Sequence, residues 1–78
     1  MKQRRANIFG LGLIGGSLAA ALTDRGWHVT GNDVRPETEE EALALGLIGA
    51  RGIDVDAEVS FVATPVSSVT EQVRRALE

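Results

Sequence analysis

The stretch that most constrains the fold is GLGLIGGSLA, which runs from Gly10 to Ala19 directly after an apolar segment. Residues 6–9 are β-prone and predict a short buried strand, whereas residues 13–25 are rich in alanine and leucine and predict a helix. Glycine weakens both kinds of element, so its repeated use at their junction indicates a backbone that turns tightly or approaches another group closely. The sequence therefore predicts a strand that passes into a helix through a glycine-rich loop.

The rest of the chain continues the alternation of strands and helices. A second strand is predicted at residues 27–30, with residues 31–33 as the turn at its carboxyl end. Pro36 suits the first turn of a second helix that continues to residue 45, and the glutamates after it favour the positive end of the helix dipole. The remaining expected elements are a short third strand at 47–48, an exposed loop at 49–58, a strand at 59–63, and a last helix from Ser68 with Val66, Val69, Val73 and Leu77 on one face.

Strands that alternate with helices over short connections predict an α/β fold with a parallel sheet of right-handed βαβ units. We expect the spatial strand order 3-2-1-4, which makes a partial doubly wound sheet of the Rossmann type. The chain has 78 residues, which limits it to one small domain. Residues 1–78 are thus predicted to be the amino-terminal part of a dinucleotide-binding domain.

Gly10, Gly12 and Gly15 match the pattern G-x-G-x-x-G at the junction of strand and helix. Gly10 permits the tight turn, Gly12 lets a pyrophosphate approach the backbone, and Gly15 lets the helix pack closely against the sheet. The N–H groups of Leu13 and Ile14 would then face the phosphates at the positive end of the helix. Because the chain has 9 glycines, the pattern can also arise by chance, and a turn without a ligand is the alternative.

Asp33 lies at the end of the second predicted strand, roughly 20 residues beyond the glycines, where a carboxylate can accept both hydroxyls of an adenosine ribose. The same carboxylate would repel a 2′-phosphate, which favours NAD over NADP. Arg35 complicates this preference, because it can stack on the adenine or pair with a 2′-phosphate, so NADP stays open. An exposed turn aspartate and a solvated loop arginine are the alternatives for these two residues.

Composition narrows the classes of function. The net charge of −3 offers no basic surface for nucleic acid or for an anionic membrane. The chain has no cysteine, which excludes disulfides, thiolate catalysis and zinc–thiolate sites and fits a reducing compartment. The basic start and the apolar run after it resemble a secretory signal, but the glycines interrupt that run. We therefore expect a cytoplasmic protein without a membrane span.

Three segments, GLGLIGGSLA, GNDVRPETEEEALALG and FVATPVSSV, together resemble the nucleotide-binding domain of the prephenate dehydrogenase family, which includes arogenate dehydrogenases. LIGGSL at residues 13–18 is the most distinctive part, because dehydrogenases of the hydroxyisobutyrate type more often carry methionine where Ile14 stands. The resemblance covers nearly the whole chain. It fits least well at residues 50–57, where the connection is shorter than the family usually has and the helix often found there is not expected.

The resemblance implies where a dinucleotide would bind. Its pyrophosphate would be held by Gly10, Gly12, Leu13, Ile14 and Gly15, its adenosine ribose would lie at Asp33 and Arg35, and its nicotinamide-side ribose would lie near Ala63, Thr64 and Pro65. The last position agrees with the rule that ligands bind at the carboxyl ends of strands, where the strand order reverses. A plain strand terminator is the alternative there.

The resemblance also implies an oxidoreductase whose catalytic residues are not in this chain. Family members oxidise prephenate or arogenate by hydride transfer to the nicotinamide, with decarboxylation, in tyrosine biosynthesis. Their catalytic histidine and a helical dimerisation domain come later in the sequence. His28, the single histidine here, is expected to be structural, and no residues have the spacing of a catalytic or metal-binding cluster. We expect this chain alone to bind the cofactor and to be inactive.

Two other interpretations stay open: a stand-alone nucleotide-binding or interaction module, and the amino-terminal half of another NAD(P)-dependent reductase. The downstream coding sequence would distinguish them from a prephenate dehydrogenase. In each case the strand at residues 59–63 is expected to present unpaired backbone groups, which recruit another chain. The sequence thus predicts a homo-oligomer that self-associates through the edge of this strand.

Overall fold

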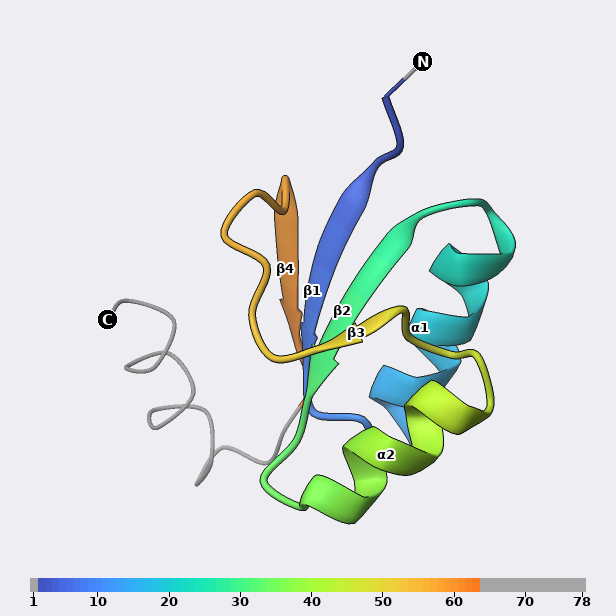
Figure 1. Cartoon of the computed structure of the whole chain (residues 1–78), viewed down its shortest axis with the longest axis vertical. Coiled ribbons are helices and arrows are strands. Elements are labelled where there is room, and N and C mark those ends of the chain that lie inside the picture. Colours follow the sequence, from blue (N-terminus) through green and yellow to red (C-terminus); the bar gives the residue numbers. More distant parts are fainter. Residues whose placement is uncertain (1, 64–78) are drawn as a thin grey trace.

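The computed structural model describes residues 2–63, which form a parallel sheet with two helices. Its elements in chain order are β1 (Arg5–Phe9), α1 (Leu13–Asp24), β2 (His28–Asn32), α2 (Pro36–Ala44), β3 (Ala50–Arg51) and β4 (Val59–Val62). The strands lie in the order β3-β2-β1-β4, and every adjacent pair is parallel (Figure 1). The predicted fold class and strand order are therefore confirmed. The helix expected after residue 66 lies outside the described residues.

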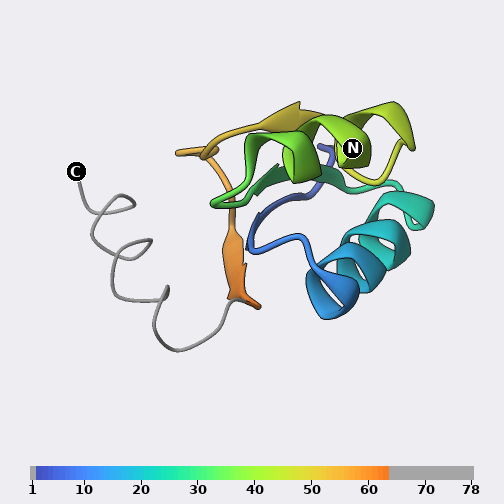
Figure 2. The same cartoon turned by 90° about the horizontal axis from the view of Figure 1, so that it is seen from below.

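Both helices lie on the same side of the sheet, and the hydrophobic core lies beneath them (Figure 2). Ile8 of β1 and Val29 of β2 are fully buried there. Ala19 of α1 and Ala42 of α2 face them, and these small side chains let the helix backbones approach the sheet closely. No helix within residues 2–63 is long and apolar enough to cross a membrane.

β2 continues through Gly31 and Asn32, which the sequence analysis wrongly placed in a turn. Its parallel pairing with β1 extends to the partners Phe9 and Asn32. Gly31 belongs to the face under the helices, where an added Cβ would lie 2.9 Å from methyl carbons of both Leu11 and Ile48. Glycine at this position makes room for two core side chains and does not end the strand.

The third strand predicted at residues 47–48 is also wrong, because β3 is formed by Ala50–Arg51. Ile48 is buried in the core, and the carbonyl oxygen of Leu47 accepts a hydrogen bond of 2.8 Å from the Thr23 hydroxyl of α1. Leu47 and Ile48 therefore pack onto the core just after α2. A short apolar run cannot by itself distinguish such a connection from a strand.

On the second face of the sheet, the connection between β3 and β4, residues 52–58, packs against part of β1 and β2 and contains no helix. Two buried asparagines on this face hold its backbone. The Asn7 amide donates to the carbonyl oxygen of Asp54 at 2.9 Å and accepts from its N–H at 2.7 Å. The Asn32 amide donates to the carbonyl oxygen of Gly52 at 3.0 Å. The two side-chain amides thus hold an irregular segment against the sheet, at the place where the resemblance implies that family members often have a helix.

Candidate functional site

The glycine loop, residues 10–12, lies at the carboxyl edge of the sheet between β1 and α1. Gly10 has a φ of 98°, a conformation that favours glycine, and its N–H donates to the carbonyl oxygen of Asn32 at 2.8 Å. The Ala63 N–H donates to the carbonyl oxygen of Phe9 at 2.8 Å, which holds the end of β4 at the end of β1. The carboxyl ends of β2, β1 and β4 therefore meet at the glycine loop.

α1 begins directly against this turn because Gly15 has no side chain. Gly15 is buried, and a Cβ there would collide with the carbonyl oxygen of Gly10 and lie 2.9 Å from its carbonyl carbon. The same Cβ would lie 3.4 Å from the Cβ of Ala63. Only glycine lets the helix, the turn and the end of β4 come this close.

The amino terminus of α1 is open. No side chain caps it, and a Cβ built on the N-cap residue Gly12 would meet nothing within 4 Å. The Gly16 N–H donates to the carbonyl oxygen of Gly12 at 2.7 Å, so the N–H groups of Leu13 and Ile14 precede it and have no acceptor within the helix. Exposed backbone donors at the positive end of a helix dipole are the arrangement that binds anions.

The carboxylate of Asp33 faces the glycine loop. One oxygen accepts the Leu11 N–H at 2.8 Å, and the other accepts the Arg35 N–H at 3.0 Å. Because a carboxylate has about four lone-pair positions, each oxygen can still accept a further donor such as a ribose hydroxyl. The sequence placed Asp33 near the loop, but the link to Leu11, by which the carboxylate also holds the loop in position, was not foreseen.

Arg35 lies two residues beyond Asp33, at the N-cap of α2. Its side chain is exposed and, within the part of the chain that the structure describes, makes no ion pair. The guanidinium is therefore not committed to another protein group there. This geometry is compatible with both roles that the sequence left open, stacking on an adenine and pairing with a phosphate.

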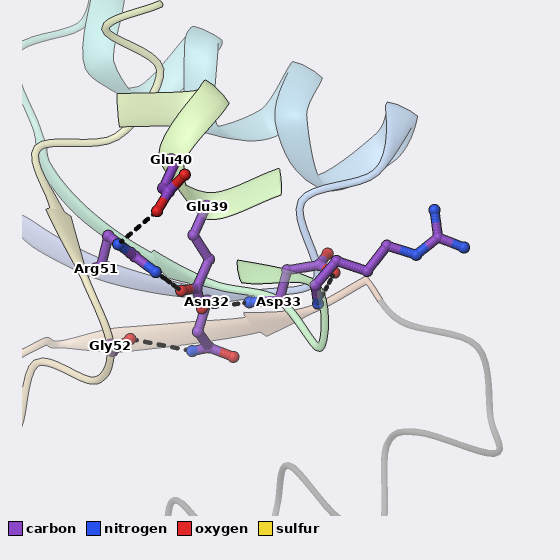
Figure 3. Close-up of polar contacts among 7 residues, drawn as sticks. Asn32, Asp33, Glu39, Glu40, Arg51 and Gly52 are labelled. Atoms are coloured by element: carbon purple, nitrogen blue, oxygen red, sulfur yellow. Dashed lines mark hydrogen bonds and ion pairs between the residues drawn. The ribbon is translucent and has the colours of Figure 1, made fainter. Parts of the chain in front are cut away.

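A network behind Asp33 connects the end of β2 to α2 and β3 (Figure 3). Glu39 accepts the Asp33 N–H at 2.8 Å through one oxygen, and its other oxygen accepts from Nη2 and Nε of Arg51 at 2.9 and 3.1 Å. A third nitrogen of Arg51 lies 3.8 Å from Glu40. Glu39 and Arg51 do not stand out in the sequence, because Glu39 is one of a run of glutamates and Arg51 falls in a segment expected to be a loop.

His28 lies at the amino end of β2. It pairs with Arg5 at the start of β1, whereas Asn32 pairs with Phe9 at its end. His28 is thus at the opposite end of β2 from the glycine loop, and its structural role stays a prediction. Among residues 2–63, no three histidine, aspartate or glutamate residues are grouped to hold a metal ion.

A groove of about 580 Å³ opens between α1 and α2. It is lined by Leu11, Gly12, Leu13, Gly16, Ser17, Ala20, Thr38, Glu41, Ala42, Leu45 and Leu47. This lining is mostly apolar, and its one charged residue, Glu41, would repel a diphosphate. The amino terminus of α1, where the groove meets the glycine loop, is therefore a better anion site than the groove itself.

The fold is found in known dehydrogenases. The arogenate dehydrogenase of Synechocystis matches 94% of this chain with a TM-score of 0.83 and 30% sequence identity. The predicted resemblance is thereby confirmed. A prephenate dehydrogenase from A. aeolicus, solved in complex with hydroxyphenyl propionate and NAD+, shares the fold over 96% of this chain, with a TM-score of 0.79 and 24% identity.

This chain covers only 28% of the arogenate dehydrogenase and 29% of the prephenate dehydrogenase. It therefore spans a little over a quarter of the length of either protein. Sequence comparison finds no matching family model and no matching curated protein.

Proposed function

We propose that this chain is the dinucleotide-binding region of a prephenate dehydrogenase-like oxidoreductase and that it binds NAD. The observation that carries the proposal is the uncapped start of α1 at Gly12, which adjoins a loop held by the Asp33 carboxylate. When bound, the nicotinamide of NAD would supply the hydride acceptor. The proposed activity of the whole enzyme is the oxidative decarboxylation of prephenate or arogenate in tyrosine biosynthesis.

The described residues fit the parts of the dinucleotide. The space beside Gly12 admits the pyrophosphate, and the N–H groups of Leu13 and Ile14 donate to it. Asp33 accepts the hydroxyls of the adenosine ribose with the lone pairs left by its two backbone donors. A phosphate on the 2′-hydroxyl would meet this carboxylate, so we propose NAD as the preferred cofactor and NADP as the weaker one.

The end of β4 is proposed for the nicotinamide side of the site. Ala63 adjoins the glycine loop through its hydrogen bond to Phe9. Thr64 and Pro65, which the sequence analysis assigned to the same region, lie outside the described residues. Their part in the site stays a prediction.

We also propose that β4 mediates self-association. In residues 2–63 it has one neighbouring strand, β1, and thus lies at the edge of the sheet. Val62 on this strand is 46% exposed. An exposed edge with an apolar side chain can pair with a second copy of the chain.

Calorimetric titration of the folded chain with NADH tests the cofactor proposal. In Gly12→Ala the added methyl occupies the space proposed for the pyrophosphate, so we expect binding to weaken by about tenfold or more, which is about 1.4 kcal/mol. Its unfolding free energy should change by less than about 1 kcal/mol, because the methyl meets no protein atom within 4 Å.

Gly16→Ala is the matched control, since it adds the same methyl one turn further into α1, 3.6 Å from the nearest atom. We expect it to bind NADH as the unchanged chain does. Equal affinity of Gly12→Ala and the unchanged chain would contradict the assignment of the pyrophosphate. No binding by the folded chain at millimolar NADH would refute the function itself.

A further inference from the structure

We propose that Glu39 makes the site selective for an adenosine ribose with a free 2′-hydroxyl. It does so in two ways, by fixing the backbone at Asp33 and by occupying the guanidinium of Arg51. This inference rests on the proposed function, because it concerns how that same site distinguishes NAD from NADP. Glu39 is a positioning residue that acts through its two neighbours.

Glu39 first fixes the backbone of Asp33. Asp33 follows the last residue of β2, so its N–H lies beyond the ladder that pairs Asn32 with Phe9. Glu39 supplies the acceptor for this N–H, at 2.8 Å. With the hydrogen bonds from Leu11 and Arg35 to the carboxylate, Asp33 is held at its backbone and at both side-chain oxygens. Its carboxylate is therefore oriented before any ligand arrives.

Glu39 also affects the site through its negative charge. The Glu39 carboxylate stands directly behind Asp33, and its side chain is only 13% exposed. Solvent and salt screen such a partly buried charge less than a fully exposed one. A ribose hydroxyl is neutral and is not repelled, whereas a 2′-phosphate would bring about two negative charges toward two carboxylates. Because Glu39 is itself bonded to Arg51, it disfavours the phosphate chiefly by keeping that cation from pairing with it.

Glu39 also holds Arg51, the cation nearest to this carboxylate pair. Figure 3 shows Glu39 between Arg51 and the end of β2. Arg51 directs Nε and Nη2 to Glu39, and Nη1 lies 3.8 Å from Glu40. Its guanidinium is thus paired with protein carboxylates and is not free to pair with a 2′-phosphate. Replacing Glu39 with glutamine keeps an oxygen that can accept the Asp33 N–H, but it removes the charge that holds Arg51.

The test compares Glu39→Gln with Glu40→Gln in the whole chain. Both remove one negative charge from adjacent positions of α2, but only the first changes a residue in contact with Asp33. The readout is the ratio of the dissociation constants for NADPH and NADH, each measured by calorimetric titration. We expect this ratio to fall by about tenfold in Glu39→Gln and to change by less than about threefold in Glu40→Gln. A merely structural effect would weaken both dinucleotides equally and leave the ratio unchanged.

An unchanged ratio in Glu39→Gln would overturn the inference while NADH binding by the unchanged chain still supported the proposed function. An equal fall in both variants would also overturn it, because general charge would then suffice. If the unchanged chain binds neither dinucleotide, the proposed function and this inference fail together.

Arg51→Met provides a second test that does not depend on the folding of Glu39→Gln. It leaves Glu39 charged and without its cation next to the Asp33 N–H, so we expect NADPH to be disfavoured further. The ratio should rise by about threefold or more. A ratio that stays the same or falls would show that the pair of Glu39 and Arg51 does not control the discrimination.

Discussion

Gly15→Ala is expected to destabilise the fold, whereas Gly16→Ala is expected to leave it as stable as before or more so. A methyl on Gly15 would collide with the carbonyl oxygen of Gly10 and lie 2.9 Å from its carbonyl carbon. These are backbone atoms, which cannot rotate out of the way as a flexible side chain can. A methyl on Gly16 would have its nearest contact at 3.6 Å, with the carbonyl oxygen of Leu11.

Both substitutions place alanine in the same helix, and alanine stabilises a helix by about 0.5–1 kcal/mol relative to glycine. Forcing a methylene-sized group into a packed region costs about 1–3 kcal/mol. Because the helix contribution is common to both variants, their difference isolates the packing term. We therefore expect Gly15→Ala to be about 1–3 kcal/mol less stable than Gly16→Ala.

Urea unfolding followed by far-ultraviolet circular dichroism measures this difference directly. The two variants should have equal slopes with urea and different midpoints, because their folded and unfolded states expose similar surface. In a thermal scan, each kcal/mol corresponds to roughly 4–8 °C for a domain of this size. Equal midpoints would refute the reasoning, since they would mean that the turn at Gly10 moves to admit the methyl at little cost.

Three further results are expected. Asp33→Ala should weaken NADH binding by about tenfold or more. It should also speed hydrogen exchange at the Leu11 amide, because it removes the acceptor of that N–H. Unchanged exchange would contradict the conclusion that the Asp33 carboxylate holds the glycine loop in position. The hydrogen bond from Arg5 holds the pKa of Asp54 below its usual value, so the unfolded chain takes up the proton first as the pH falls. The stability from the pair of Arg5 and Asp54 is thus present above about pH 4 and is lost as the pH falls through the lower folded pKa. Asp54→Asn should therefore flatten the acid side of a plot of urea midpoint against pH. A plot that this substitution leaves unaltered would refute the role of the pair. Val62→Lys on the β4 edge should reduce self-association in sedimentation measurements, whereas a monomeric unchanged chain at high concentration would contradict self-association.

The alternation of strands and helices could be predicted from the sequence because it depends on local patterns. Local signals mark three of these elements: the β-prone residues 6–9, the alanine-rich helix after them, and Pro36 at the start of α2. The strand order is the one that such right-handed βαβ units form in doubly wound sheets. The elements that were misplaced depend on distant contacts. Gly31 looked like a turn residue, but its role is to make room for Leu11 and Ile48 over β2.

The candidate site could be predicted only in part for the same reason. The glycines and Asp33 have a recognisable spacing, because each must occupy a fixed place relative to one strand and one helix. The contact of Glu39 with Arg51 joins α2 to β3, and no local pattern marks either partner. The buried amides of Asn7 and Asn32 were likewise missed, since their role depends on a connection that crosses the second face of the sheet.

The most direct test of the central claim is a titration of the isotope-labelled chain with NAD, followed amide by amide by nuclear magnetic resonance. We expect the largest shifts at the N–H groups of Gly12, Leu13 and Ile14, with a second group of shifts around Asp33. Saturation without shifts at the start of α1, or shifts confined to the groove between α1 and α2 near Ala20 and Leu45, would contradict the claim that the bare backbone of the glycine loop receives the diphosphate.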